Sequence, residues 1–521
     1  IEQTVMKALK YIAAGLLLVS LGSCKSDILD REPLDRLSPN TFYENDTQCK
    51  MGLVGIYSSL PPIATVAFWF QQDFMSDDAY CQDSWQGSRE IGEWQTNSSS
   101  WGPNAKWTQQ YQTIIRANTF LLNLEKATAS EETKKQMAGE AKFLRAYAYS
   151  DLITFFGDVP LILGDQTLET AKVPRDSKEK VLNAIIQDLN DAAAVLPESY
   201  SGSDVGRATK GAALAQKCRI LLYNEKWTEA AEAAKQVMDL NVYSLYPDYG
   251  MTFDESNENN CEVIFDIQYI KNSQAQPWPS ARLSFVDWPT PNVTADMIDS
   301  YYMTNGKAIT DAGSGYNPQD PFKNRDPRMA ASIVLPGSLC ASGTFIPAND
   351  QVPCGTRPRK YADIKGTDSY NVGLNQIVLR YADILLMRAE ALIEQGNTSQ
   401  EVYDLIDKVR ARVNMPKIED AEGTGLTQEQ LRKILRHERR VEFFMEGTRY
   451  TDMLRWKDES LVHDVYGYVK DKLSDPTNPS KWVFETEKKA TRNFDSKKGW
   501  LWPIPHDEIQ NNDKLTQNPG Y

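Results

Sequence analysis

Residues 211–240, GAALAQKCRILLYNEKWTEAAEAAKQVMDL, decide the expected fold because they have the pattern of two helices that pack on each other. The apolar positions follow steps of three and four, and they are Leu214, Cys218 and Leu221, then Ala230, Ala234 and Val237. Such steps place side chains on one face of a helix. Trp227 stands at the turn, and small residues allow the two helices to approach closely. The stretch therefore predicts a helical hairpin.

Other stretches with the helical period surround this hairpin. Residues 132–156 have one apolar face and end at Gly157, and residues 176–196 carry another apolar stripe. A further pair of helices is predicted over 384–391 and 405–413. The spacing within the pairs is similar to that of tetratricopeptide units, although the repeats are not evenly spaced. We therefore expect a mainly α protein with an irregular tetratricopeptide-like helical-repeat frame, an architecture whose broad surfaces usually serve binding.

One long segment lacks helical periodicity. Residues 241–375 are rich in Pro, Gly, Asn and aromatic residues. This composition predicts a loop-rich insert with a few short strands, such as residues 262–269. The helical frame is expected to occupy residues 41–240 and 376–521. Frame and insert together make one expected domain, residues 41–521.

The amino terminus has the form of a targeting signal. A short basic region, residues 6–10, precedes an apolar stretch, residues 11–21, which is too short to cross a bilayer comfortably. The sequence Leu-Gly-Ser-Cys then ends at Cys24 and resembles the cleavage box of bacterial lipoprotein signals. This resemblance predicts that residues 1–23 are removed, that Cys24 carries lipid, and that residues 24–40 form a tether. The alternative is a cleaved signal followed by an incidental cysteine.

Composition argues against several functional classes. The formal net charge of −14 argues against a nucleic-acid ligand, whose phosphates require a basic surface. The three histidines lie far apart and the seven cysteines include no C-x-x-C pair, so we predict no metal site and no cofactor. Cys340 and Cys354 lie in a Gly/Pro-rich stretch and form either a disulfide or two free thiols.

Four segments carry a resemblance to one family. They are residues 33–60, with Leu37-Ser38, Phe42 and Gly55-Ile56-Tyr57; residues 379–391, LRYADILLMRAEA; residues 438–456, with ERRVEF, EGTRY and DMLRW; and residues 503–521, which begin with Pro-Ile-Pro and end with Gln-Asn-Pro-Gly-Tyr. In order and spacing they resemble the SusD/RagB family of outer-membrane nutrient-binding lipoproteins. The resemblance implies a surface receptor without catalytic activity. Such a receptor captures oligosaccharide or polysaccharide for a SusC-like TonB-dependent outer-membrane barrel, which it covers as a hinged lid.

The charged residues of the third segment allow two interpretations. Glu438, Arg439, Glu442, Glu446 and Arg449 can form a ladder, because side chains three or four residues apart meet on a helix. Buried arginines need carboxylate partners, so such a ladder would specify packing. Alternatively, Glu438 and Glu442 are the carboxylate pair of a glycosidase, although the surrounding arginines argue against that chemistry.

The resemblance further implies that aromatic side chains on loops contact sugar rings. Two polar, aromatic-rich segments without helical periodicity offer this combination, residues 77–101 and 278–302. The candidate ligand-binding residues are Asp78, Trp85, Arg89 and Trp94 in the first segment and Trp278, Trp288 and Tyr301 in the second. Each aromatic residue could instead be a loop anchor. The tryptophans assigned to structural roles are Trp107, Trp227, Trp456, Trp482, Trp500 and Trp502.

Other functions are compatible with parts of the sequence. A receptor for oligopeptides in the same kind of transport system would use similar aromatic grooves with polar rims. A surface glycosidase would need an activated carboxylate pair in a cleft. A protein scaffold would not need the long aromatic insert, and a free-standing adhesin would use the same tether without a barrel.

Overall fold

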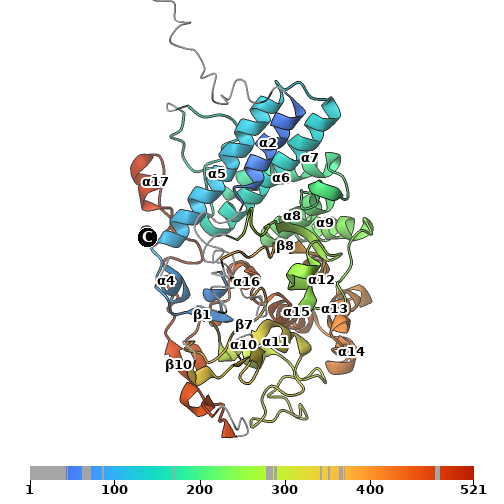
Figure 1. Ribbon diagram of the computed structural model, residues 1–521, viewed down its shortest axis with the longest axis vertical. Coiled ribbons are helices and arrows are strands. Elements are labelled where there is room, and N and C mark those ends of the chain that lie inside the picture. Colours follow the sequence, from blue (N-terminus) through green and yellow to red (C-terminus); the bar gives the residue numbers. More distant parts are fainter. Residues whose placement is uncertain are drawn as a thin grey trace, which may run out of the picture.

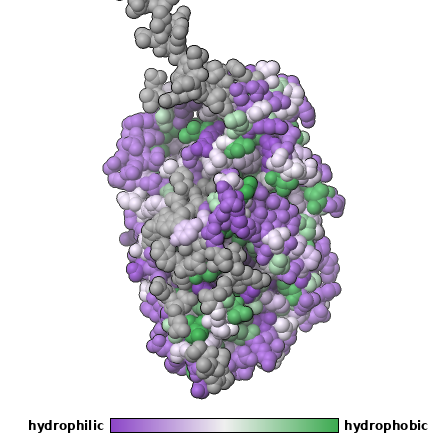
Figure 2. Space-filling view, viewed as in Figure 1, coloured by the Kyte–Doolittle hydropathy of each residue, from purple (hydrophilic) through white to green (hydrophobic). Residues whose placement is uncertain are grey.

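The computed structural model describes residues 43, 45–60, 72–84, 87–167, 170–276, 286, 290–340, 343–349, 352–362, 368, 370–475 and 481–521. The prediction of a mainly α protein is confirmed, because helices are the main elements and the strands are short. None of the helices in these ranges is both long and apolar enough to cross a membrane. Among the residues coloured in Figure 2, hydrophilic ones predominate and apolar ones form small separate groups.

The frame is a row of helices in which each helix packs against the next. Its members are α2 (Asp46–Tyr57), α5 (Trp101–Leu124), α6 (Glu131–Phe156), α7 (Lys178–Val195), α8 (Lys210–Tyr223), α9 (Trp227–Asp239), α12 (Tyr381–Glu394), α13 (Gln400–Arg412) and α15 (Gln428–Phe443). Contacts run from α5 through α6, α7, α8 and α9 to α12, which also contacts α13 and α15. The row begins beside α2 at one end of the molecule and continues past its middle (Figure 1).

Capping residues and apolar faces explain how the helices of this row form. The side chains of Ser130, Ser177 and Thr209 accept backbone N–H groups in the first turns of α6, α7 and α8. All six apolar positions predicted for the hairpin are buried where α8 meets α9. The predicted hairpin is therefore confirmed, and so are the helices predicted over 132–156 and 176–196.

The strands pair two by two, and every described pair is antiparallel. The pairs are β1 (Ala79–Cys81) with β3 (Pro291–Val293), β2 (Val263–Ile267) with β8 (Gln376–Arg380), β4 (Ile333–Val334) with β7 (Arg357–Pro358), β5 (Leu339–Cys340) with β6 (Gly343–Thr344), and β9 (Val465–Tyr468) with β10 (Thr486–Ala490). Shorter helices accompany them: α4 (Ser88–Gly92), α10 (Ala295–Ser300), α11 (Pro327–Ser332), α14 (Ile418–Ala421), α16 (Thr448–Trp456) and α17 (His506–Asn511).

The β2–β8 ladder joins the two ends of the predicted insert. Val263 pairs with Arg380, so the chain leaves the frame and returns to it at neighbouring points. The strand predicted over residues 262–269 is confirmed as β2. Within the insert, Cys340 and Cys354 are free thiols, which decides between the two alternatives left by the sequence.

Buried ion pairs hold the insert on the frame, and α15 is their centre. Glu442 accepts hydrogen bonds from Arg380 at 2.6 Å, from Arg328 at 3.0 Å and from Arg412. Five carboxylates, Glu262, Asp326, Glu438, Glu442 and Glu446, face five cations, Arg328, Lys360, Arg380, Arg410 and Arg412. Their charges balance, which makes burial of so many ionised groups tolerable.

The expected ladder along one helix is wrong, although the requirement for carboxylate partners is confirmed. Arg439 pairs with Asp383 and Asp452 at 2.8 Å, and Arg449 donates to Asp77 at 2.8 Å. The partners come from other elements because these side chains point into the interior, where neighbouring segments supply the opposite charges. The motif therefore specifies how distant segments dock.

Candidate ligand-binding site

Strand pairing brings together the two segments predicted to bind ligand. In the β1–β3 ladder, Tyr80 lies opposite Asn292 and Cys81 lies opposite Pro291. The Thr294 hydroxyl also donates to the Asp77 carbonyl at 2.6 Å. Because the strands are antiparallel, residues after Cys81 and residues before Pro291 leave the same end of the ladder.

Four of the candidate residues have described positions, and Arg89 is the accessible one among them. Arg89 lies on α4, its side chain is 51% exposed, and its Nε is 3.5 Å from Glu93 Oε1. Glu93 also accepts from the Tyr80 hydroxyl at 3.0 Å, which ties α4 to β1. Glu90 accepts from Asn97 at 3.0 Å. These groups form a polar rim next to the end of the ladder, with both donors and acceptors.

The other three described candidates have structural contacts. Asp78 and Tyr301 are completely buried, which contradicts their predicted contact with a ligand. Asp78 accepts a hydrogen bond from Arg440 at 2.6 Å. The Tyr301 side chain belongs to the same hydrophobic core cluster as Met329. Trp94 is half-buried, donates to the Met75 carbonyl at 2.8 Å, and meets three aromatic rings edge-on. It is a loop anchor in this structure.

The remaining candidates, Trp85, Trp278 and Trp288, lie outside the described residues, as does Cys24.

An ionic cluster behind β1 fixes the ladder to α15 and α16. Arg440 donates to Asp78 and to Asp296, each at 2.6 Å, and lies 3.1 Å from Asp77. Burial opposes ionisation of Asp77, but Arg440 and Arg449 hold its pKa below the usual range. Burial raises the pKa of the neighbouring Asp78 to about 6. Buried charge thus anchors the base of the candidate site.

One group of side chains in the described residues has the donor types of a cation site. Asp77, Asp296 and His463 bring one ligand atom each within 4.8 Å of one another. The Arg440 guanidinium contacts both carboxylates, so positive charge is already supplied there by the protein. The guanidinium thus offsets the repulsion between the two acidic residues.

The carboxylates considered for acid–base chemistry lie in the interior network. Glu438 and Glu442 are buried and bound by arginines. Burial works against their ionisation, yet the arginines lower the pKa of Glu438 and hold that of Glu442 well below its usual range. A general acid must carry a proton near neutral pH, so neither residue suits that role.

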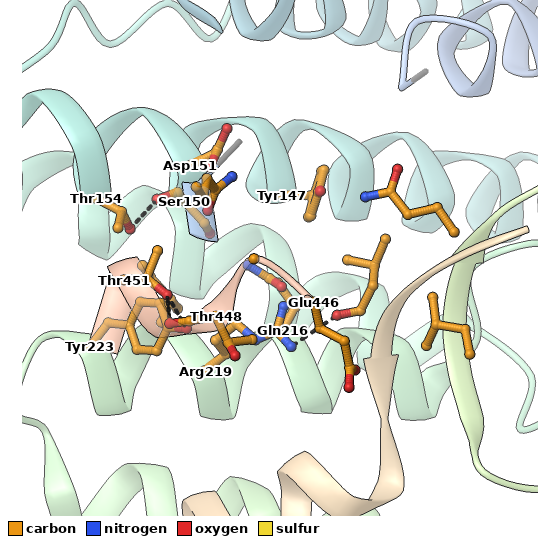
Figure 3. A pocket seen from close by; sticks show the side chains of 16 residues that line it. Tyr147, Ser150, Asp151, Thr154, Gln216, Arg219, Tyr223, Glu446, Thr448 and Thr451 are labelled. Atoms are coloured by element: carbon orange, nitrogen blue, oxygen red, sulfur yellow. Dashed lines mark hydrogen bonds between the residues drawn. The ribbon is translucent and has the colours of Figure 1, made fainter. Parts of the chain in front are cut away.

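A small polar pocket lies between α6, α8 and α16, with a volume of about 100 Å³ (Figure 3). Gln216 and Arg219 extend into it from α8, and Asp151 from α6. Gln216 Oε1 and Arg219 Nε are buried and have no hydrogen-bond partner among the described residues, so the pocket presents an acceptor and a donor together. This mixture suits hydroxyl groups or water. Gln216, Arg219 and Tyr223 follow steps of three and four, a polar stripe that the apolar pattern alone does not reveal.

Comparisons with known proteins agree across the whole chain. The family model described as SusD family matches residues 261–521, and one described as starch-binding associating with outer membrane matches residues 28–222. SusD-like protein P25 of Formosa agariphila is 25% identical over 99% of this chain and 100% of its own length. Starch-binding protein SusD of Bacteroides thetaiotaomicron is 23% identical over 85% of this chain and 83% of its own length. The crystal structure of a SusD-like carbohydrate-binding protein from Bacteroides fragilis has a TM-score of 0.81 and 28% identity, and covers 91% of this chain and 100% of that one.

Proposed function

The chain belongs to the SusD family, and from this premise we propose that it captures oligosaccharides at the cell surface and delivers them to a TonB-dependent outer-membrane transporter. Carbohydrate binding is supported by the similar proteins described as binding starch or carbohydrate. The observation that carries a specific site is the β1–β3 ladder, which joins the two aromatic-rich segments.

The proposed glycan site lies beyond the end of this ladder. Trp85 lies four residues after Cys81, and Trp288 lies three residues before Pro291. In sequence, both tryptophans therefore lie just beyond the Cys81–Pro291 end of the ladder. We include Trp278 as a third aromatic candidate. Arg89 on the polar rim supplies hydrogen bonds to hydroxyl groups. An aromatic ring beside a sugar buries apolar C–H groups, and the polar rim satisfies the hydroxyls.

The test is a titration of the soluble mature protein with a panel of oligosaccharides, by calorimetry. For the ligand that binds, Trp85→Ala or Trp288→Ala should weaken binding by about 1–3 kcal/mol, the contribution of one large aromatic contact. Leu122→Ala removes a 40% exposed apolar side chain near the end of α5, in the helical frame, and serves as the control. Parental affinity in the tryptophan variants would place the site elsewhere, and binding of peptides alone would refute a glycan receptor.

Membrane attachment and partnership form the second part of the proposal. Lipid on Cys24 would anchor the protein in the outer membrane, and residues 24–40 would tether it over a SusC-like barrel. Tethering raises the local concentration of the receptor over the barrel. Mild detergent extraction followed by affinity purification should recover a barrel protein in near-equal amount. Recovery of the lipoprotein alone, with ligand uptake intact after deletion of the barrel, would refute the lid.

The proposed receptor binds its ligand without hydrolysing it. The support is the position of Glu438 and Glu442, which are buried among arginines and are held ionised. Long incubation with the bound oligosaccharide should leave its chain length unchanged in chromatography. Appearance of shorter products with pure protein would contradict this part.

A further inference from the structure

A second cavity, of about 720 Å³, lies where α7 begins and α16 ends. The C-terminal segment closes one side of it with Trp500 and Asn518. It adjoins the small polar pocket, because Thr154, Tyr223 and Thr451 line both. These three side chains are visible at one end of the pocket in Figure 3, where the Tyr223 and Thr451 hydroxyls are 3.1 Å apart.

Three cations line this cavity without a carboxylate partner in the described part of the chain. Neither the Lys178 nor the Lys457 ammonium has a carboxylate within ion-pair distance or another hydrogen-bond partner there. Arg175 donates to Asn518 Oδ1 at 2.7 Å, to the Thr516 hydroxyl at 3.1 Å and to the Asp158 carbonyl at 3.3 Å, and its Nε is buried without a partner among the described residues. A fourth cation, Arg455, is already neutralised by Glu390.

The acidic residues of the same cavity leave its charge positive. Asp158 and Glu225 are the carboxylates that line it among the described residues. Asp158 uses one oxygen to accept the backbone N–H of Lys178 at 2.7 Å. Burial and then the charge of Lys457 lower the pKa of Lys178, while the charges of Glu225 and Asp158 raise it, so all three charged side chains act on the Lys178 ammonium group. The cavity is therefore a positively charged region in a protein whose net charge is −14.

Neither lysine is placed where helix stability alone would put it. Lys178 is the first residue of α7, where the helix dipole is positive and disfavours a cation. Lys457 has φ 53° and ψ 40° at the end of α16, a left-handed conformation that favours glycine. Backbone strain of the kind seen at Lys457 is often found at ligand-binding sites. Here both present positive charge to one cavity.

A positively charged cavity suits a ligand with a negative charge, and the uncharged residues that line it indicate what kind of ligand that is. Trp500 lines the cavity, and its ring also packs on Trp94 and Phe494. Thr154, Tyr223 and Asn518, with hydroxyl and amide groups, line it as well. A free anion would need no aromatic wall, whereas a sugar ring would. We propose that this cavity binds an acidic saccharide residue, with its carboxylate or sulfate group between Lys178 and Lys457. The proposal rests on glycan capture and adds a subsite for charged sugars.

The test compares charged and neutral probes by calorimetry or NMR titration of the full mature protein. D-glucuronate should bind about tenfold more tightly than D-glucose, and inorganic sulfate should compete with it, since a charge-assisted contact is roughly twice as strong as a neutral one. The double variant Lys178→Gln/Lys457→Gln should lose this preference. Lys50→Gln on α2 also removes one exposed positive charge and should keep it.

Each outcome decides the proposal separately from the glycan site. Equal binding of glucuronate and glucose would overturn the proposal. A preference for glucuronate that persists in the double variant would overturn it as well. Binding of sulfate without glucuronate would refute the saccharide assignment. The double variant should bind neutral oligosaccharides like the parent, so loss of neutral binding in Trp85→Ala tests only the first site. If the double variant unfolds, the single variants Lys178→Gln and Lys457→Gly should each weaken the preference for glucuronate, and a preference unchanged in both would overturn the proposal.

Discussion

Glu442→Gln is expected to destabilise the protein strongly, because Glu442 is the shared partner of three guanidinium groups. The carboxylate is completely buried and accepts from Arg328, Arg380 and Arg412. A neutral amide would leave surplus buried positive charge and direct an NH2 group toward other donors. Removing one partner of a buried ion pair lowers the free energy of unfolding by about 3–5 kcal/mol.

Urea unfolding followed by circular dichroism measures this change. The control is Glu429→Gln on the same helix, where the side chain is 70% exposed and pairs with Lys433 at 2.9 Å. An exposed pair contributes at most about 1 kcal/mol, so the control should unfold close to the parent. The Glu442→Gln midpoint should be lower by about 1 M.

The pH dependence follows from the lowered pKa of Glu442. Burial opposes its ionisation, but Arg412, Arg380 and Arg328 hold its pKa well below the usual range. Its stabilisation is therefore present above the unfolded pKa of about 4.3 and is lost as pH falls toward the folded value. The gap between parent and Glu442→Gln should narrow below about pH 4. Equal midpoints of the two glutamine variants at pH 7 would refute the reasoning.

Three further predictions follow from local features. Lys457→Gly should raise the free energy of unfolding by about 1 kcal/mol, because glycine removes the strain of the left-handed backbone; an unchanged or lower urea midpoint would contradict this. Cys340 and Cys354 should both react with a thiol reagent in protein unfolded without reductant, and joint protection of the two would indicate a disulfide. Cys24→Ala should move the protein from the outer-membrane fraction to the soluble fraction or stall its processing; a variant that still carries lipid would disprove the anchor.

Local periodicity was sufficient to predict the helical frame. The apolar steps in residues 211–240 depend on neighbours within one or two turns, and the structure forms α8 and α9 there. The same holds for α6 and α7, whose caps are also local. The short strand β2 was predictable because Val263 to Ile267 is a compact apolar run.

The partners of charged residues could not be predicted, because they depend on tertiary contacts. Nothing near Glu442 in sequence identifies Arg328, which is 114 residues away. The burial of Asp78 has the same origin, since Arg440 comes from 362 residues further along the chain. A polar, aromatic-rich segment is compatible with either a buried or an exposed position. The pairing of residues 79–81 with 291–293 could therefore not be predicted from the sequence either.

The β2–β8 ladder has a consequence for how this architecture can change. Residues 268–375, here called the cassette, leave β2 at Ile267 and enter β8 at Gln376. Because these two residues pair, the strands hold both ends of the cassette together. Loop-closure entropy rises only slowly with length, so insertions confined to the exposed loops of this cassette should alter stability little. Its buried contacts are the constraint: any replacement must return an arginine to Glu438 and Glu442 and a lysine to Glu446, and must refill the core around Tyr301. A grafted cassette that meets these requirements could present a different recognition surface on an unchanged helical scaffold.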